Sequence, residues 1–317
     1  MKSKTEILEF ERKWALPAGI MAMAAVAIYV GAQVWGGTQF STSGGQAEAL
    51  EAIKGHYGAV TLSTILQGIG IVLLAGPLVY LFLAEVARSE RVRTAFLGLM
   101  IVGPLFLGIA SGLSGATLVA ASKAYDANSP AITKCVDQKT KDAETSGDKA
   151  KPTSDELDTF KTDCADDEAK DLKTSSGPTS LATGFGIAGS IAFAISVVYA
   201  ALWAMRIGLL TRFWASLGMA LGAVSIIPYF FIFVLIWFLF LGLIIAGWIP
   251  RGRPPAWAAA EAIPWLLPGE ELDEDDDVIE GTGEPVDNGD LTDREAGPEA
   301  RATGERIKRK KRRLPPE

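Results

Sequence analysis

The sequence contains two cysteines, Cys135 and Cys164, and both lie in one polar stretch between long apolar segments. Two thiols confined to an extracytoplasmic loop favour a disulfide. This disulfide would close a loop of about 30 residues and stabilise the fold by about 3–4 kcal/mol in the chain-entropy model. The two cysteines do not form a C-x-x-C motif, so a thiol-redox pair is not predicted.

Residue types that carry out enzymatic chemistry are not arranged in a recognisable pattern. The sequence has no P-loop, no H-E-x-x-H motif and no G-x-S-x-G motif. The single histidine, His56, has no nearby partners suited to catalysis or to metal binding. We therefore predict a protein that is not an enzyme and that has no catalytic residue, no metal site and no cofactor.

The most polar side chain deep in an apolar segment is Gln67, and two Gly-Pro pairs place Pro77 and Pro104 in neighbouring segments. Proline removes a helix hydrogen bond and opens a kink. Two kinks at similar depth would enclose a small cavity, for which these three residues are the candidates. The alternative is ordinary packing of kinked helices, with the amide hydrogen-bonded to a neighbouring helix.

Five long stretches without a charged side chain dominate the sequence. A bilayer core takes about 20 apolar helical residues to cross, so each stretch predicts at least one transmembrane helix. The last stretch is long enough for two helices, and Pro228 interrupts it; one long kinked helix is the alternative. The stretches are Trp14–Trp35, Ala59–Leu83, Ala95–Ala121, Pro178–Met205 and Phe213–Pro250.

The predicted fold is an all-α membrane protein. It comprises a six-helix transmembrane bundle, a disulfide-stapled extracytoplasmic loop and a disordered, charged C-terminal tail. Positive residues in short loops mark the cytoplasmic side, and their distribution places both termini in the cytoplasm. The predicted order is a cytoplasmic N-terminus at 1–13, spans one to three at 14–121, the loop at 122–182, spans four to six at 183–248 and the cytoplasmic tail at 249–317.

The extracytoplasmic loop is predicted to contain a helix. The sequence Thr153-Ser-Asp-Glu156 is typical of a capping box, and a helix is expected to continue from it through Lys173. The preceding residues 142–152 predict a polar linker. Two interpretations of the loop stay open: a small cap that binds a ligand, or a stapled polar loop without one.

The tail combines an acidic run at 270–277 with a basic run at 308–313. Residues 279–306, rich in Gly, Glu, Asp and Pro, predict disorder. Six cations on a tethered cytoplasmic segment predict contact with anionic lipid headgroups or with a cytoplasmic protein. RNA is a further alternative, without sequence-specific recognition. The six candidate contact residues are Lys308, Arg309, Lys310, Lys311, Arg312 and Arg313.

A stretch near the end of the apolar region resembles a family of bacterial multi-pass membrane proteins with no assigned activity. The resemblance covers residues 199–257 and rests on the strings LWAMR, GLLTRFW, LGMALG and GRPPAW. It implies a location in the bacterial inner membrane, and it implies no catalytic residue.

Two functions from different classes remain. The first is a non-enzymatic envelope adaptor or scaffold, which contacts lipid through its spans and a partner through its charged tail. The second is a transporter or channel for a small solute, with its cavity at the kinked second and third spans. Pairs of small residues four positions apart also allow close helix contacts within one chain or in a homo-oligomer.

Overall fold

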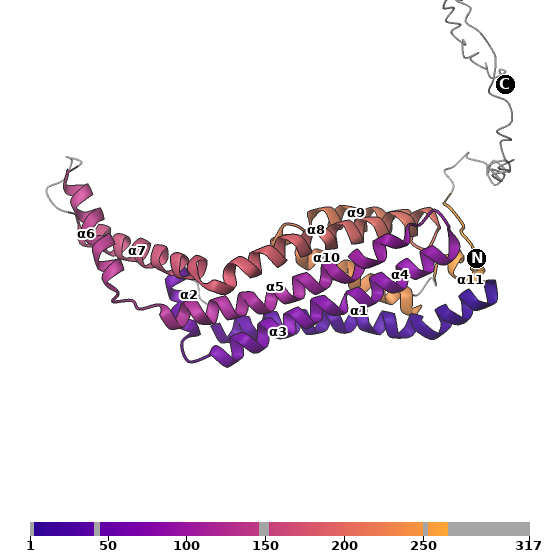
Figure 1. Cartoon of the computed structure of the whole chain (residues 1–317), viewed down its shortest axis with the longest axis horizontal. Coiled ribbons are helices and arrows are strands. Elements are labelled where there is room, and N and C mark those ends of the chain that lie inside the picture. Colours follow the sequence, from indigo (N-terminus) through magenta and orange to yellow (C-terminus); the bar gives the residue numbers. More distant parts are fainter. Residues whose placement is uncertain (1–2, 41–44, 146–151, 250–252, 266–317) are drawn as a thin grey trace, which may run out of the picture. The chain divides into compact units, whose positions relative to one another are not determined.

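In the computed structural model, residues 3–40, 45–145, 152–249 and 253–265 are described, and these residues form helices and no strand. The long helices lie side by side in a bundle (Figure 1). The all-α fold predicted from the sequence is thus confirmed. The elements are α1 (Lys4–Phe40), α2 (Gln46–Ile53), α3 (Tyr57–Leu73), α4 (Ala75–Arg88), η1 (Thr94–Phe96), α5 (Leu97–Ala124), α6 (Pro130–Thr145), α7 (Ser154–Ser175), α8 (Gly177–Arg206), α9 (Arg212–Val224), η2 (Pro228–Phe230), α10 (Phe231–Ala246) and α11 (Pro255–Ala259).

Four helical segments in this part of the chain are long and apolar enough to cross a membrane. Their outer faces carry large apolar side chains such as Leu62, Ile101 and Ile187, with 49%, 46% and 58% of their surface exposed. Contiguous apolar surface of this extent indicates contact with lipid, and the chain is therefore a membrane protein. The segments are Lys4–Thr38, Tyr57–Arg88, Thr94–Ala124 and Gly177–Arg206.

The two Gly-Pro pairs affect their helices differently. Leu74 separates α3 from α4, because Pro77 has no N–H to donate to the carbonyl of Leu73. The backbone N–H of Leu74 instead donates to the carbonyl of Ile71, three residues back, which tightens the turn. Pro104, by contrast, lies inside the uninterrupted helix α5. A local tightening of the helix at Leu74, which keeps helical dihedral angles, therefore accompanies the first proline and not the second.

The last apolar run folds as two antiparallel helices, α9 and α10, with η2 between them. The Trp237 indole N–H donates to the carbonyl of Trp214 at 2.9 Å, and the rings of Trp214 and Phe240 lie 4.7 Å apart. The ring of Trp237 also lies against Gly218. The two helices therefore run in opposite directions. The interruption covers residues 225–230 and includes Pro228, which the sequence predicts as the point of interruption.

The most extensive helix pair in the bundle is α5 with α8. Glycines bring these backbones together, since a Cβ atom on Gly103 would lie 2.7 Å from the backbone nitrogen of Phe193. A Cβ atom on Gly68 of α3 would similarly lie 2.6 Å from the carbonyl oxygen of Gly108. Close backbone approach replaces the hydrophobic drive that lipid does not supply. Gly112, one turn after Gly108, has nothing within 4 Å of such an atom.

Helices α2, α6 and α7 form a small unit at the C-terminal end of α5, and we call this unit the cap. It has its own apolar core, which includes Leu50, Tyr125 and Cys164. The capping box at the start of α7 is present, and α7 runs to Ser175. Helix α6 covers residues 142–145, which the sequence assigns to a linker; residues 146–151 lie outside the described part.

The chain after α10 differs from the prediction of a tail that is disordered from residue 249. Residues 253–265 pack against the bundle, and they include the short helix α11, with Ala256 and Trp257 buried. We call residues 253–265 the docked segment. The predicted acidic run, the low-complexity stretch and the basic run at 308–313 all lie outside the described residues.

Candidate functional site

A buried ion pair joins α1 to α4 at the end of the bundle opposite the cap. The guanidinium of Arg88 donates two hydrogen bonds to the carboxylate of Glu11, one of them at 3.1 Å. The two side chains have 0% and 4% of their surface exposed. Arg88 also donates to the carbonyls of Ala84 at 3.1 Å and of Ala256 at 3.1 and 3.3 Å. Each guanidinium nitrogen therefore has a partner, as a buried charge requires.

Aromatic rings enclose this ion pair. The Trp257 ring of α11 lies near two guanidinium groups, with the Cζ atoms of Arg88 and Arg253 each 5.6 Å from its centroid. On α4, the ring of Tyr80 stacks on Trp257 at 6.0 Å and on Phe10 of α1 at 6.2 Å. Cation–π and stacking contacts are strongest where water is excluded, as it is here. We call Glu11, Tyr80, Arg88, Arg253 and Trp257 the base cluster.

The docked segment also satisfies carbonyl groups at helix C-termini. Arg253 donates to the carbonyls of Ile244, at 3.2 Å, and Ile245 in the last turn of α10. A cation at this position also complements the negative end of the helix dipole. The indole N–H of Trp257 donates to the carbonyl of Leu209, and that of Trp265 donates to the carbonyl of Leu210, both at 2.9 Å. Both carbonyls belong to residues that follow α8. These bonds fix the point at which the tail leaves the bundle.

Two polar groups on α4 lack hydrogen-bond partners among the residues that the structure describes. Both carboxylate oxygens of Glu85 are buried and unpaired, and so is the hydroxyl of Tyr80. Glu85 has none of its surface exposed. Ionisable groups are rare within membrane spans and usually have a functional role, so Glu85 is a further candidate site residue.

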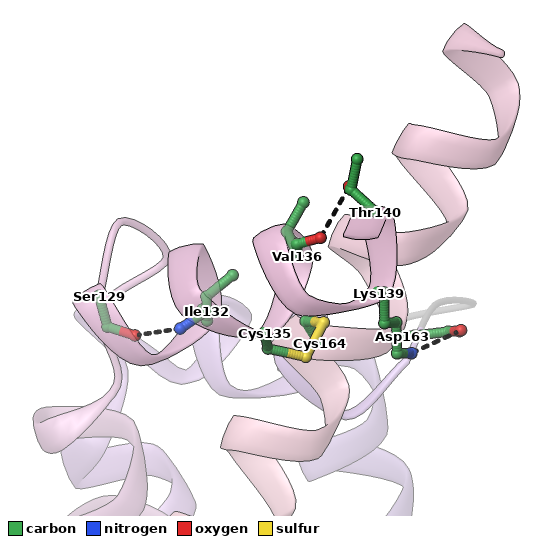
Figure 2. Close-up of a disulfide and its surroundings, with 8 residues drawn as sticks. All are labelled: Ser129, Ile132, Cys135, Val136, Lys139, Thr140, Asp163 and Cys164. Carbon is green, nitrogen blue, oxygen red and sulfur yellow. Dashed lines mark hydrogen bonds and ion pairs between the residues drawn. A yellow bond between two sulfur atoms is a disulfide. The ribbon is translucent and has the colours of Figure 1, made fainter. Parts of the chain in front are cut away.

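The predicted disulfide between Cys135 and Cys164 is present, with Cα atoms 5.9 Å apart. Figure 2 shows that it joins α6 to α7, with the ion pair of Lys139 and Asp163 beside it at 3.1 Å. On α7, Asp166 accepts the backbone N–H of Ala47 at 2.8 Å. This bond satisfies a free donor at the start of α2. A covalent bond and polar contacts therefore hold the three helices of the cap together.

Two titratable groups in the cap have shifted pKa values. Burial raises the pKa of the Tyr125 hydroxyl above its usual value of 10.0, and the carboxylates of Glu51 and Asp166 raise it further. Burial lowers the pKa of the Lys173 ammonium, and Asp166 partly offsets this effect. The Lys173 ammonium donates to the Gln46 side chain at 2.5 Å, which links α7 to α2.

Gln67, Pro77 and Pro104, the three candidate cavity residues, do not lie together around any of the five pockets considered in the described part of the chain. Gln67 is half-buried, and Pro77 and Pro104 are buried. None of the three lines any of five pockets in the described part of the chain. The candidate cavity stays a prediction. The six candidate contact residues of the basic run lie outside the described residues.

Sequence reasoning missed the base cluster. Neither Arg88 nor Glu11 stands out in the sequence as a candidate site residue. The two residues are 77 positions apart, and a periodic or motif-based analysis does not detect such pairs. The available signal was the position of Glu85 and Arg88 directly after an apolar run. No family model, curated protein or solved structure matches the chain.

Proposed function

We propose that the protein is a non-enzymatic scaffold of the bacterial inner membrane, with both termini in the cytoplasm. Two observations support this orientation. Arg88, Arg206 and Arg212 lie at helix ends away from the cap, and clustered cations favour the cytoplasmic side. The disulfide lies in the cap, and disulfides persist in oxidising compartments. The proposed inner-membrane location rests on the resemblance of residues 199–257 to bacterial multi-pass membrane proteins.

We further propose six membrane crossings, with α9 and α10 as the last two. The antiparallel contact of these helices supports a hairpin that enters and leaves at the base cluster. Their 13 and 16 residues correspond to about 20 and 24 Å of helix, so the connecting residues 225–230 must contribute to the crossing. Tyr229, with 89% of its surface exposed, is in this connection.

A membrane-impermeant thiol reagent tests the six-crossing proposal. A cysteine replacing Tyr229, with both native cysteines changed to serine, is expected to react from outside intact cells. A cysteine replacing Phe213, which is 66% exposed at the start of α9, is the matched control and should react after lysis. A Tyr229→Cys variant that stays unreactive until lysis would contradict the sixth crossing.

The observation that carries the scaffold proposal is the docked segment. Arg88, Arg253 and Trp257 hold the root of the tail in one place on the bundle through hydrogen bonds and ring contacts. A rigid root would give the chain a fixed point of departure from the bundle after Trp265. The acidic and basic runs of the tail would then be the contact with a cytoplasmic protein or with anionic lipid headgroups.

Crosslinking in intact cells, followed by mass spectrometry, tests the scaffold function. The full chain should be compared with a chain ending after Trp265, because earlier truncation would remove the partners of Arg88 and disturb the bundle. A third sample carries glutamine at residues 308–313. We expect a partner with the full chain that is lost on truncation, and loss in the third sample would assign the contact to the basic run. Equal recovery of every partner from the full and truncated chains would contradict the scaffold function.

A second candidate function is transport of a small solute. The local irregularity at Leu74, three residues before Pro77, supports it, because irregular spans often border the binding site of a transporter. Flux in vesicles should fall when Pro77 and Pro104 are both replaced by alanine, or when Gln67→Ala removes the amide. Unchanged flux in these variants would exclude this cavity as the route.

A further inference from the structure

Glu85, in the last turn of α4, is a buried ionisable residue that the base cluster leaves without a partner. None of its surface is exposed, and neither carboxyl oxygen has a hydrogen-bond partner in the described chain. Glu11 is also buried, but its carboxylate accepts two hydrogen bonds from Arg88. Two glutamates at the same end of the bundle therefore have opposite surroundings.

The Glu85 side chain extends an apolar face of α4. Leu78, Leu81 and Phe82 precede it at helical spacing, so the four side chains share one face of the helix. These three apolar side chains are at most 1% exposed and belong to the main core of the bundle. The Phe82 ring lies 6.3 Å from the ring of Tyr199 on α8. Glu85 thus points with them into the packed interior, and it lines none of the five pockets considered above.

The cations near Glu85 already have partners or lie in solvent. Arg88, three residues further along α4, donates to Glu11 and to two backbone carbonyls. Arg253 donates to two carbonyls in the last turn of α10. The other described cations of α1, of α8 and of the residues directly after α4 are exposed, and they are Lys4, Arg12, Lys13, Arg91, Arg93 and Arg206.

The remaining ionisable groups around α4 do not compensate a charge on Glu85. Helices α3 and α5 carry such groups only at the cap end, Tyr57 and Lys123, and α10 carries none. The hydroxyl of Tyr199 accepts the backbone N–H of Arg93 at 3.0 Å, and that of Tyr80 has no partner. A carboxylate at Glu85 would therefore be an isolated negative charge in an apolar interior. The carboxylates of Glu6, Glu9 and Glu90 are exposed.

We propose that Glu85 is a proton-binding site, and that its carboxyl group carries a proton whenever α4 is packed in the bundle. An isolated carboxylate loses far more hydration free energy on burial than the neutral acid does, so the group binds a proton instead. The environment thus assigns the two glutamates different states: Glu11 is an ionised partner of Arg88, and Glu85 is a neutral acid. This inference does not depend on the scaffold function or on transport.

The proton makes the packing of α4 sensitive to pH. The buried site offers a carboxylate neither water nor an uncommitted cation, so Glu85 ionises when the end of α4 leaves its packed position and the carboxyl group reaches water. The packed state therefore holds one proton that the open or unfolded chain releases. Because the unfolded state binds fewer protons, stability falls as pH rises above the range in which an exposed glutamate ionises, about pH 4.3.

Infrared spectroscopy of the full-length protein in detergent, with isotope-labelled glutamate, tests for the proton directly. At about pH 7 an exposed glutamate is ionised, so only a protected one shows the carbonyl stretch of a neutral acid. We expect this band in the wild type and its loss in Glu85→Gln. Glu90→Gln removes an exposed carboxylate just after α4 and is the matched control, which should keep the band. A wild-type spectrum without the band overturns the proposal, whether or not Glu85→Gln folds.

The pH dependence of unfolding tests the coupling to packing. Glutamine has the shape of the neutral acid but binds no proton in this range. Between about pH 6 and about pH 8, the unfolding equilibrium constant of the wild type divided by that of Glu85→Gln should rise about tenfold per pH unit while the folded state keeps its proton. The same ratio taken with Glu90→Gln should stay constant. A ratio to Glu85→Gln that does not change with pH overturns the proposal.

Discussion

Removing one member of the Glu11 and Arg88 pair should destabilise the protein far more than removing both. Arg88→Met leaves a carboxylate that is 4% exposed without its cation, and breaking a buried pair in this way costs about 3–5 kcal/mol. The variant also loses two hydrogen bonds to Ala256, worth about 1 kcal/mol each. Glu11→Leu leaves the guanidinium without its anion and should cost about 4 kcal/mol.

The double variant carries apolar side chains of similar size at both positions. The double variant still lacks the hydrogen bonds to Ala256, which lowers its free energy of unfolding by about 2 kcal/mol, but it contains no uncompensated charge. We therefore expect the double variant to be more stable than either single variant. The measurement is unfolding by SDS titration in mixed micelles, followed by far-UV circular dichroism.

The ion pair of Lys4 and Glu261 is the matched control, because it also joins α1 to the docked segment but is exposed. Its side chains are 65% and 55% exposed, and removing either should cost less than about 1 kcal/mol. Additive losses at Glu11 and Arg88, or single losses no larger than those of the control pair, would refute the assignment of a desolvated, coupled pair.

Three other predictions concern packing, redox state and pH. Gly103→Ala should destabilise the protein by more than about 2 kcal/mol, because its Cβ atom would lie 2.7 Å from the backbone of α8. Gly112→Ala, which has open space around its Cβ atom, should be neutral or stabilising in the same unfolding assay. Thiol labelling of intact cells should modify Cys135 and Cys164 after reduction and not before, and labelling without reductant would contradict the disulfide. The raised pKa of Tyr125 means that the folded state binds a proton that the unfolded state releases above pH 10.0, so stability should fall as pH rises past this value. Tyr125→Phe should reduce this fall, and an identical pH profile in the variant would contradict the buried hydroxyl.

Features that depend on local sequence could be predicted well. Four of the five uncharged runs coincide with helical segments long and apolar enough to cross a membrane, because a bilayer imposes apolarity along an entire crossing. The capping box at Thr153 and the break at Pro228 also follow from neighbouring residues. The disulfide followed from the presence of both cysteines in one polar stretch between apolar segments.

Features that depend on distant partners could not be predicted. Trp257 and Trp265 suit a segment lying on the membrane surface equally well, and only contact with Leu209 and Leu210 distinguishes docking from that alternative. Helix α6 is not indicated by the sequence, which assigns the last residues of this helix, 142–145, to a polar linker. Its apolar residue Ile132 packs into the core of the cap, and the disulfide joins it to α7. Tertiary contacts thus override the local polarity.

The docked segment also imposes an order on the biosynthesis of the protein. Arg88 enters the membrane region early in translation, but its partner carbonyl at Ala256 and the covering ring of Trp257 are made 168 or more residues later. Until those residues leave the ribosome, Arg88 has Glu11 and Ala84 as partners but lacks the two hydrogen bonds to Ala256 and the ring of Trp257. The end of α4 therefore reaches its final, covered state only when the last described residues of the chain have been made.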